Sequence, residues 1–560
     1  MATFENIDEQ CDGLLINSEN FQALNLLQER YKEQVKCVYI DPPYNAKSSE
    51  IVYKNNYKKS SFASFIENRI KLSYYLIKNE GLIDLAIDDY EFNNVSYILD
   101  SIFGRENFIA NIVVTHNPRG RNDDKFFGTS HEYMIVYSKN KNLTSINDFP
   151  LDDKSRKQYN RKDNISEYAI TSYMRTGNNS NKFERPNLFY PIFINTKDYS
   201  LSLEPRENTI EVLPINSNNE EKTWRWEKKT FLEKKETELL VQQSNNGLQI
   251  YKKRRIINAG RKPKTTWSDS RYDASANGIM FLRKYLNKDL FSYPKSIYTV
   301  YDALQITATD KSIILDYFAG SATTAHAVIN LNRKDQGNRK YILVEMGEYF
   351  NTVTKPRVQK VVYSDEWKDG KPTTRNGSSH IFKYGRLESY EDTLNNIVLQ
   401  KTMMDSAMYE GYVLRYSLEV ESRDSLLMLE AFKSPFGYTI QSTENNELKE
   451  TEVDLVESFN YLIGLKVKTT EIIRGYVVVT GETLEEKKVL VIWRDIDKHS
   501  NEDLNEFCKK MRYNPLDGEF DQIYVNGDNN IENLKTGEER WKVKLIEHEF
   551  HKRMWEKIDM

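Results

Sequence analysis

Cysteine is scarce in this 560-residue sequence. The three cysteines, Cys11, Cys37 and Cys508, have neither the paired spacing of zinc ligands nor the even number of a disulfide framework. His548 and His551 lie three residues apart, but no cysteine or third ligand accompanies them, so we expect surface or capping positions. The sequence therefore predicts reduced thiols and no metal site.

Long apolar runs and an excess of one charge are also missing. No stretch approaches the roughly 20 residues of a membrane span, and residues 1–5 begin nothing like a signal peptide, so we expect a cytoplasmic protein with no membrane association. No Gly-x-x-x-x-Gly-Lys-Ser/Thr pattern marks a phosphate loop. The 79 lysines and arginines nearly balance 83 acidic residues, giving a net charge of −4. A nucleic-acid partner would therefore require positive charge to be gathered locally.

The most informative segment is Asp41-Pro42-Pro43-Tyr44. It follows the apolar run 36–40, which predicts a buried strand, and two prolines make the exit from that strand stiff and extended. A carboxylate and an aromatic ring are thus held at the carboxyl end of a strand, where open α/β sheets bind ligands. Alternatively, the segment is only a strand-terminating turn with a surface tyrosine.

These residue types suit methylation of an exocyclic amine on a nucleobase. Such an amine is a poor nucleophile because its lone pair is delocalised into the ring. The Asp41 carboxylate and the Pro42 carbonyl can accept its hydrogens and free that lone pair. Tyr44 offers a flat face for an extruded base.

A second pattern lies far downstream. The apolar run 312–318 contains Asp316 near its end, small residues follow at 319–324, and an apolar helical face begins at Ala325. A strand, a small-residue turn and a helix N-terminus suit a ligand that needs close backbone approach. The next predicted strand, 340–345, ends in Glu345, the place where nucleotide-type folds bind ribose hydroxyls. The alternative is an ordinary βαβ unit without a ligand.

Together these motifs resemble the β-class amino-methyltransferases of DNA, most closely the modification (Mod) subunits of type III restriction systems. Asp41-Pro42-Pro43-Tyr44 resembles the catalytic motif of that family, residues 315–327 its cofactor motif, 291–296 the motif that closes over the cofactor, and 338–345 the strand with the ribose-binding acid. The order, catalytic motif first and cofactor motif last, also matches. The resemblance implies S-adenosyl-L-methionine as cofactor, bound by Asp316, Phe318, Ala319, Gly320, Ser321, Thr323, Glu345, Pro294 and Lys295.

Two details bear on activity. The family usually has glycine where Ala322 stands; we expect a tolerated methyl group, because alanine is strained only if φ is positive. Asp41 in place of serine favours adenine N6 over cytosine N4, which stays the alternative together with a catalytically weakened recognition subunit. A glutamine-modifying methyltransferase of the release-factor type is disfavoured, because its cofactor motif comes first and its catalytic motif begins with asparagine.

The predicted fold is α/β: a Rossmann-like S-adenosylmethionine-dependent methyltransferase domain with permuted motif order, an inserted target-recognition domain and a small C-terminal α/β domain. Apolar periodicity predicts helices over 20–31, 62–77 and 93–103 and strands over 82–88, 111–115 and 133–137. The expected domains are 1–140 (catalytic half), 141–280 (target recognition), 281–384 (cofactor half) and 385–560 (dimerisation or partner docking). In the last domain we expect a strand over 489–493 and helices over 503–511 and 541–555.

The inserted region is rich in polar and aromatic residues, including Trp224, Trp226 and Trp267, which suits contacts with base edges. The alternative is a variable insertion with no DNA role. Its basic run and two arginines nearer the catalytic half are the candidate DNA-binding residues: Lys252, Lys253, Arg254, Arg255, Arg119 and Arg121. The expected partners are double-stranded DNA, a second copy of the chain in a homodimer, and a separate ATPase and nuclease (Res-like) subunit.

Overall fold

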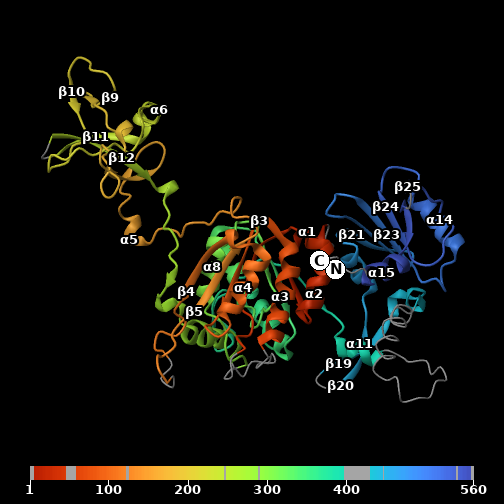
Figure 1. Ribbon diagram of the computed structural model, residues 1–560. Helices are drawn as coiled ribbons and strands as arrows, with labels where there is room; N and C mark the ends of the chain where they lie inside the picture. Colours follow the sequence, from red (N-terminus) through yellow and green to blue (C-terminus); the bar gives the residue numbers. More distant parts are fainter. Residues whose placement is uncertain are drawn as a thin grey trace. The chain divides into compact units, whose positions relative to one another are not determined.

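The computed structural model describes residues 6–45, 59–120, 125–244, 247–287, 290–396, 429–444, 447–537 and 540–555. The chain forms two compact units, a main unit of Met1–Asn147 and Lys264–Met560 and an inserted unit of Asp148–Pro263 (Figure 1). The insertion expected over 141–280 is therefore shorter. Residues 264–280 return to the main unit, where β13 (Thr266–Trp267) pairs with β4 (Phe108–Val114).

A nine-stranded sheet forms the centre of the main unit, in the order β13-β4-β5-β3-β2-β14-β15-β1-β18. The strands from β3 to β18 are parallel to their neighbours, whereas β5 is antiparallel to both β3 and β4. β2 is buried along its whole length, as expected for a parallel strand covered on both faces. The remaining bounds are β1 (Gly13–Asn17), β2 (Val35–Ile40), β3 (Ile77–Ile87), β5 (Glu132–Ser138), β14 (Ile313–Asp316), β15 (Lys340–Glu345) and β18 (Phe382–Arg386).

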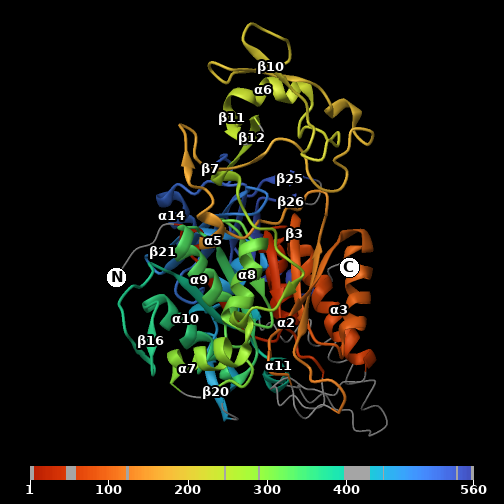
Figure 2. The ribbon, with the colours of Figure 1, turned by 90° about the vertical axis from the view of Figure 1, so that its left-hand side faces the viewer.

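Helices cover both faces of this sheet. α2 packs against α3 and α3 against α4, while α8 packs against α9 and α9 against α10. Figure 2 shows α8, α9 and α10 on one side of the sheet and α3 on the other. The bounds are α2 (Asn20–Tyr31), α3 (Lys59–Leu76), α4 (Phe92–Phe103), α7 (Met280–Leu286), α8 (Ile297–Thr307), α9 (Thr323–Asp335) and α10 (Thr354–Tyr363). The helices predicted over 20–31, 62–77 and 93–103 thus correspond to α2, α3 and α4, because their apolar residues face the buried core.

The connections create a switch point between β2 and β14. From β2 the chain passes through α3 to β3 on one side, and from β14 it passes through α9 to β15 on the other. β2 and β14 are direct neighbours, with Leu315 opposite Val38. Asp41 and Asp316 therefore follow neighbouring strands at one edge of the sheet, the place where open α/β sheets form a binding crevice.

The C-terminal part of the main unit contains a five-stranded sheet in the order β21-β22-β23-β24-β27, with apolar clusters packed on it. Its elements are α13 (Leu455–Leu462), β21 (Lys466–Ile473), β22 (Tyr476–Glu482), β23 (Lys488–Trp493), α14 (Asn501–Met511), β24 (Gln522–Val525), β27 (Val543–Leu545) and α15 (Ile546–Trp555). The strand predicted over 489–493 and the helix over 503–511 correspond to β23 and α14. The helix predicted over 541–555 was wrong at its start, because 543–545 adds a strand to β24.

Buried charges connect this part to the rest of the main unit. Asp8 forms ion pairs with Arg30 of α2 and with Lys383 of β18, the latter at 2.6 Å. Lys383 also lies 2.6 Å from Glu457 of α13. Removing one partner of such a buried network leaves an uncompensated charge, which is strongly destabilising. Among the described residues, no helix combines the length and the apolar character that a membrane crossing requires.

The inserted unit is built from two small antiparallel sheets, β11-β12-β7-β6 and β10-β8-β9. Its elements are α5 (Asp153–Arg156), β6 (Arg161–Lys162), β7 (Glu167–Ser172), β8 (Ile192–Asn195), β9 (Leu201–Ser202), β10 (Thr209–Val212), α6 (Lys228–Glu238), β11 (Leu239–Ser244) and β12 (Gly247–Arg255). Trp224 lies in its core and stacks on Tyr173 with ring centres 5.3 Å apart.

Candidate active site

Lys295 reaches the segment that follows β2. Its ammonium nitrogen lies 3.1 Å from Asp41 Oδ1 and donates to the Tyr44 hydroxyl. The same nitrogen lies 2.5 Å from Oε2 of Glu132, the first residue of β5, and the Tyr44 hydroxyl donates to that oxygen over 2.9 Å. Oxygen atoms of three residues thus converge on one nitrogen that carries hydrogens.

The charges of this cluster are strongly coupled. Burial raises the pKa of Asp41, and the Glu132 charge raises it further, against the opposing effect of Lys295. Burial also acts to raise the pKa of Glu132, but Lys295 and His116 outweigh it and the pKa is lowered. About a quarter of the Asp41 side chain (26%) stays exposed, whereas Glu132 is nearly fully buried. Asp41 is therefore the carboxylate of the cluster that a ligand can reach.

Glu132 and His116 were missed by sequence reasoning. His116 follows β4 and its Nδ1 lies 3.8 Å from Glu132 Oε2. No local pattern in the sequence marks them, because the antiparallel pairing of β5 with β3 and β4 is what brings them to the edge where Asp41 lies. Asn45, directly after Tyr44, has a φ of +56° and donates to Glu91 over 2.9 Å.

The second motif forms a tight corner between β14 and α9. Asp316 accepts hydrogen bonds from the Phe318 backbone (3.0 Å) and from the Thr324 hydroxyl (2.5 Å). Burial, with smaller contributions from the charges of Asp41 and Glu345, raises the pKa of Asp316 to about 7, although those hydrogen bonds favour its charged form. Asp41 and Glu345 are therefore close enough to disfavour the ionisation of Asp316.

Glu345, at the end of β15, holds the turn from the other side. Its carboxylate accepts hydrogen bonds from the backbone of Gly320 (2.7 Å) and of Gly347 (2.8 Å). Gly320 has a φ of +51°, and a Cβ atom there would lie 3.2 Å from the Phe291 ring. The position thus requires glycine for its conformation, and Phe291 covers the turn.

Ala322 corrects one expectation. It has a φ of +63°, in the left-handed region, and is fully buried directly before α9. A non-glycine residue in this conformation costs about 1–2 kcal/mol. The methyl group is therefore strained here. Arg357 holds the strained turn through the Ser321 hydroxyl (2.8 Å) and the Thr323 hydroxyl (2.9 Å).

The remaining predicted cofactor residues lie around the same corner. Phe318 and Ala319 are buried between β14 and Gly320. Pro294 is buried too, and a Cβ atom on Gly278 would lie 2.2 Å from its carbonyl oxygen, so this segment needs close backbone approach. Lys295, the next residue, points into the Asp41 cluster, so residues 294 and 295 join the two motifs.

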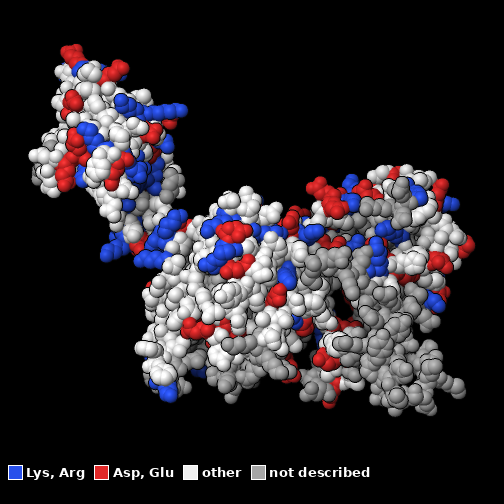
Figure 3. All heavy atoms as spheres, viewed as in Figure 1, with Lys and Arg blue, Asp and Glu red and all other residues white. Residues whose placement is uncertain are grey.

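The side chains of the basic run 252–255 on β12 alternate between the two faces of the strand. Arg255 pairs with Asp163 (2.9 Å) and Glu238 (2.6 Å), and Lys253 also pairs with Asp163 (2.8 Å). Lys253 and Arg255 are therefore paired with carboxylates within the inserted unit. This pairing argues against the predicted role of the two residues in phosphate contact. Figure 3 shows lysine and arginine side chains gathered on the surface of this unit.

Lys252 and Arg254 lie on the opposite face of β12 from Lys253 and Arg255. Arg254 is exposed, and Lys252 lies 5.0 Å from the centre of the Trp226 ring. Burial lowers the pKa of Lys252, and the neighbouring Arg225 lowers it further. Burial likewise lowers the pKa of Arg225, with additional repulsion from Arg175 and Arg254. This mutual repulsion favours an anion beside these cations.

The other residues predicted to contact DNA differ in their exposure to solvent and in the unit to which they belong. Arg119 is exposed in the loop after β4, whereas Arg121 lies outside the described residues. Trp267 belongs to the main unit and is buried against Tyr272, so Trp267 and the core residue Trp224 are structural; Trp226 is half-buried.

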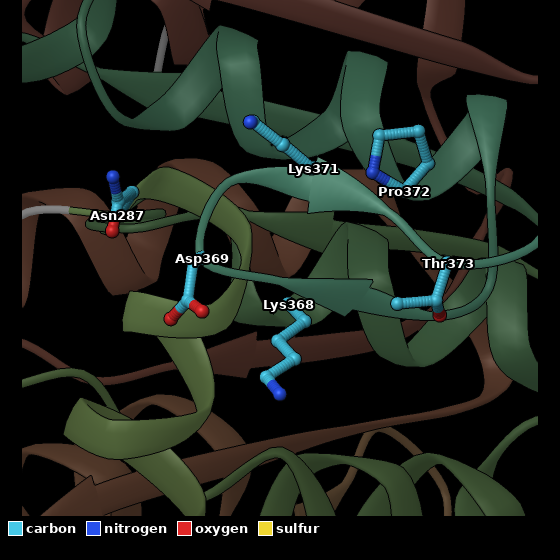
Figure 4. Close-up of a pocket in the computed structure, with 6 residues that line it drawn as sticks. All are labelled: Asn287, Lys368, Asp369, Lys371, Pro372 and Thr373. Carbon is cyan, nitrogen blue, oxygen red and sulfur yellow. The ribbon is translucent and has the colours of Figure 1, made fainter.

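A hollow of about 520 Å³ lies at the hairpin formed by β16 (Trp367–Lys368) and β17 (Lys371–Pro372) (Figure 4). It contains no residue of either motif; its lining is Asn287, Lys368, Asp369, Lys371, Pro372 and Thr373. Within the described ranges, no group of three or more His, Cys, Asp or Glu side chains is arranged to hold a metal ion.

Known proteins resemble this chain in sequence. Residues 35–355 match the family model described as DNA methylase. Type II methyltransferase M.KpnI of Klebsiella pneumoniae is 34% identical over 339 residues, covering 58% of this chain and 79% of that protein. The EcoPI Mod subunit of a type III restriction-modification enzyme, from Escherichia phage P1, is 28% identical over 466 residues, covering 73% and 70%. The solved PvuII DNA methyltransferase (cytosine-N4-specific) aligns with a TM-score of 0.32 and 11% identity over 63% of this chain and 92% of that chain.

Proposed function

This chain belongs to the DNA methylase family, and from that premise we propose that it methylates the N6 amine of adenine in double-stranded DNA at a specific sequence. The assignment of the methylation site to this edge of the sheet rests on one observation. Asp41, Tyr44 and Glu132 all place oxygen atoms around one N–H donor, Lys295 Nζ. A site that accepts the hydrogens of an ammonium group also suits those of an exocyclic amine.

Asp41 is the proposed acceptor of the amine hydrogen. Its carboxylate is partly exposed, and Pro42 has no backbone donor that could compete for it. Accepting that hydrogen localises the nitrogen lone pair, which then forms the bond to the methyl carbon while the carbon–sulfur bond breaks. The amine then gives one proton to the Asp41 carboxylate, so that the product nitrogen is neutral. Tyr44 supports the base through its ring face.

S-Adenosyl-L-methionine supplies the methyl group on a positively charged sulfur. The corner between β14 and α9 fits such a ligand, because the negative charges of Asp41 and Glu345 repel that of the buried Asp316 carboxylate. A cation beside them relieves that repulsion. Gly320 lets the backbone come close to the ligand, and we assign Ser321 and Thr323 to the methionine side and Glu345 to the ribose side of the site.

The proposed restriction context is a type III system. Its support is the similarity to the EcoPI Mod subunit across 73% of this chain. In that setting the inserted unit reads the target sequence, and Lys252, Arg254 and Arg119 contact phosphates. The C-terminal sheet serves dimerisation or docking of a separate ATPase and nuclease subunit. Sedimentation of the chain alone and with such a subunit tests both associations.

The decisive experiment is nucleoside analysis of DNA methylated by the purified chain with S-adenosyl-L-methionine. N6-methyladenine is the expected product, and long-read sequencing of the same DNA gives the target site. N4-methylcytosine as the only product would overturn the adenine assignment. Complete absence of methylated bases would overturn the catalytic assignment and leave a recognition subunit.

A further inference from the structure

The loop between β4 and β5 opens at the edge of the sheet where Asp41 lies. β5 is antiparallel to β3, with Tyr133 opposite Ile87, so the first residues of β5 lie at the carboxyl end of β3. The Asn117 backbone donates to the Ser130 carbonyl over 3.1 Å, which holds the two ends of the loop together. The described residues between these two positions, 118–120 and 125–129, therefore belong to a loop that opens at the catalytic edge.

This loop contains the two most exposed large apolar side chains among the described residues. Phe126 is 83% exposed and Phe127 is 90% exposed. Burying a phenylalanine side chain contributes roughly 1.5–3 kcal/mol, so two adjacent rings in water forgo a large stabilisation. Exposed apolar surface of this kind marks an interaction site.

Charge indicates which partner covers these rings. The Lys125 ammonium lies 5.3 Å from the centre of the Phe126 ring, and the exposed Arg119 belongs to the same loop. Aromatic rings beside cations match a nucleic acid, in which flat bases lie next to phosphates. The loop is also continuous with Glu132, which accepts the Tyr44 hydrogen bond.

Extracting a base from a duplex costs a few kcal/mol and leaves a gap in the stack. We propose that Phe126 and Phe127 form a wedge that enters this gap while the target base turns toward Asp41 and Tyr44. Phe127 lies five positions before Glu132 in the chain, a span of at most about 18 Å, so the wedge can act on the base pair being opened. Apolar side chains inserted between bases unstack DNA in this way. The inference rests on the proposed base methylation.

The test replaces both rings by alanine (Phe126→Ala with Phe127→Ala). Duplexes that carry 2-aminopurine in place of the target adenine report base opening, because its fluorescence rises when the base leaves the stack; matched duplexes that keep the adenine report the methylation rate. We expect the double variant to lose most of that rise and about tenfold in methylation rate on a fully paired duplex. On a duplex with an abasic site opposite the target, where opening is easy, the rate should return to within about twofold of the wild type.

Two controls keep the result specific. The double leucine variant (Phe126→Leu with Phe127→Leu) retains an apolar wedge and should keep most of the fluorescence rise. Tyr97→Ala removes another exposed ring of the main unit, 75% exposed on α4, and should change neither readout. Wild-type fluorescence in the double alanine variant, or equal rate losses on both duplexes, would overturn the wedge. Absence of methylation by the wild type would instead contradict the proposed function.

Discussion

Lys295 Nζ lies 3.1 Å from Asp41 Oδ1, although the whole inserted unit separates the two residues in sequence. The contact joins the segment after β2 to the segment before α8. It places a positive charge beside a carboxylate whose pKa burial raises, and so favours the ionised form of that carboxylate. Segments on both sides of the inserted unit in sequence therefore complete one cluster of charged side chains.

Asp41→Ala should reduce methyl transfer by about 10²–10⁴-fold, the range typical of losing a positioned acid–base group. DNA binding should stay within about twofold, because Asp41 carries no phosphate contact. Single-turnover methylation and a binding titration measure the two effects. Asp89→Ala, which removes an exposed carboxylate after β3, is the control and should leave the rate unchanged. Full turnover by Asp41→Ala would contradict the role.

Glu132→Gln should shift the pH dependence of methylation. The Glu132 charge raises the pKa of Asp41, so its removal lowers that pKa. Asp41 must be ionised to accept a hydrogen, and the acid limb of the profile of kcat/KM should therefore move to lower pH. The maximal rate should also fall, because Tyr44 and Lys295 then share a neutral amide oxygen in place of a charged carboxylate. An acid limb that stays in place or moves upward would refute the coupling.

The local elements around both motifs could be predicted from sequence because their patterns are local. β2 is a continuous apolar run ended by two prolines, and α2 has its apolar residues at helical spacing over the predicted range. The order of the strands was not predicted; the structure shows that the two motif strands, β2 and β14, are neighbours.

Partners that depend on long-range register could not be predicted in the same way. Glu132 is an acid at the start of a strand, and only the antiparallel pairing of β5 with β3 brings it to Tyr44. The division of the run 252–255 depends on Asp163, a partner about 90 residues earlier in the chain. The conformation of Ala322 likewise followed from packing of the turn, which the sequence does not encode locally.

Ala322→Gly should stabilise the protein by about 1 kcal/mol, because glycine adopts a φ of +63° without the roughly 1–2 kcal/mol strain of alanine. Thermal unfolding measures the change, and titration with S-adenosyl-L-methionine shows whether the relaxed turn binds it more tightly. Ala325→Gly, inside α9, is the matched control. It should destabilise by at least about 0.5–1 kcal/mol, because that position is helical. If both variants destabilised the protein, the proposal that Ala322 is strained would be contradicted.

Neutralising the basic residues on one face of β12 should have a different effect from neutralising those on the other face. Lys252→Ala with Arg254→Ala should reduce the slope of log affinity for DNA against log salt by about 2, one unit for each phosphate that is no longer neutralised. Lys253→Ala with Arg255→Ala should instead lower the thermal stability of the inserted unit, because Asp163 and Glu238 lose their partners. An unchanged salt slope in the first variant would refute phosphate binding by this face.

Binding of S-adenosyl-L-methionine should depend on pH through Asp316. The pKa of this carboxyl is raised to about 7, so in the free protein it is largely protonated at pH 6 and largely ionised at pH 8. A positively charged ligand prefers the ionised form, and its affinity should be about tenfold weaker at pH 6 than at pH 8 and level off above pH 8. Calorimetric titrations at pH 6, 7 and 8 measure this trend. Asp316→Asn should bind weakly at all three values and show no such slope, because the amide does not titrate. A wild-type affinity that is constant between pH 6 and 8, or a slope that persists in Asp316→Asn, would show that this carboxyl does not face the bound cation.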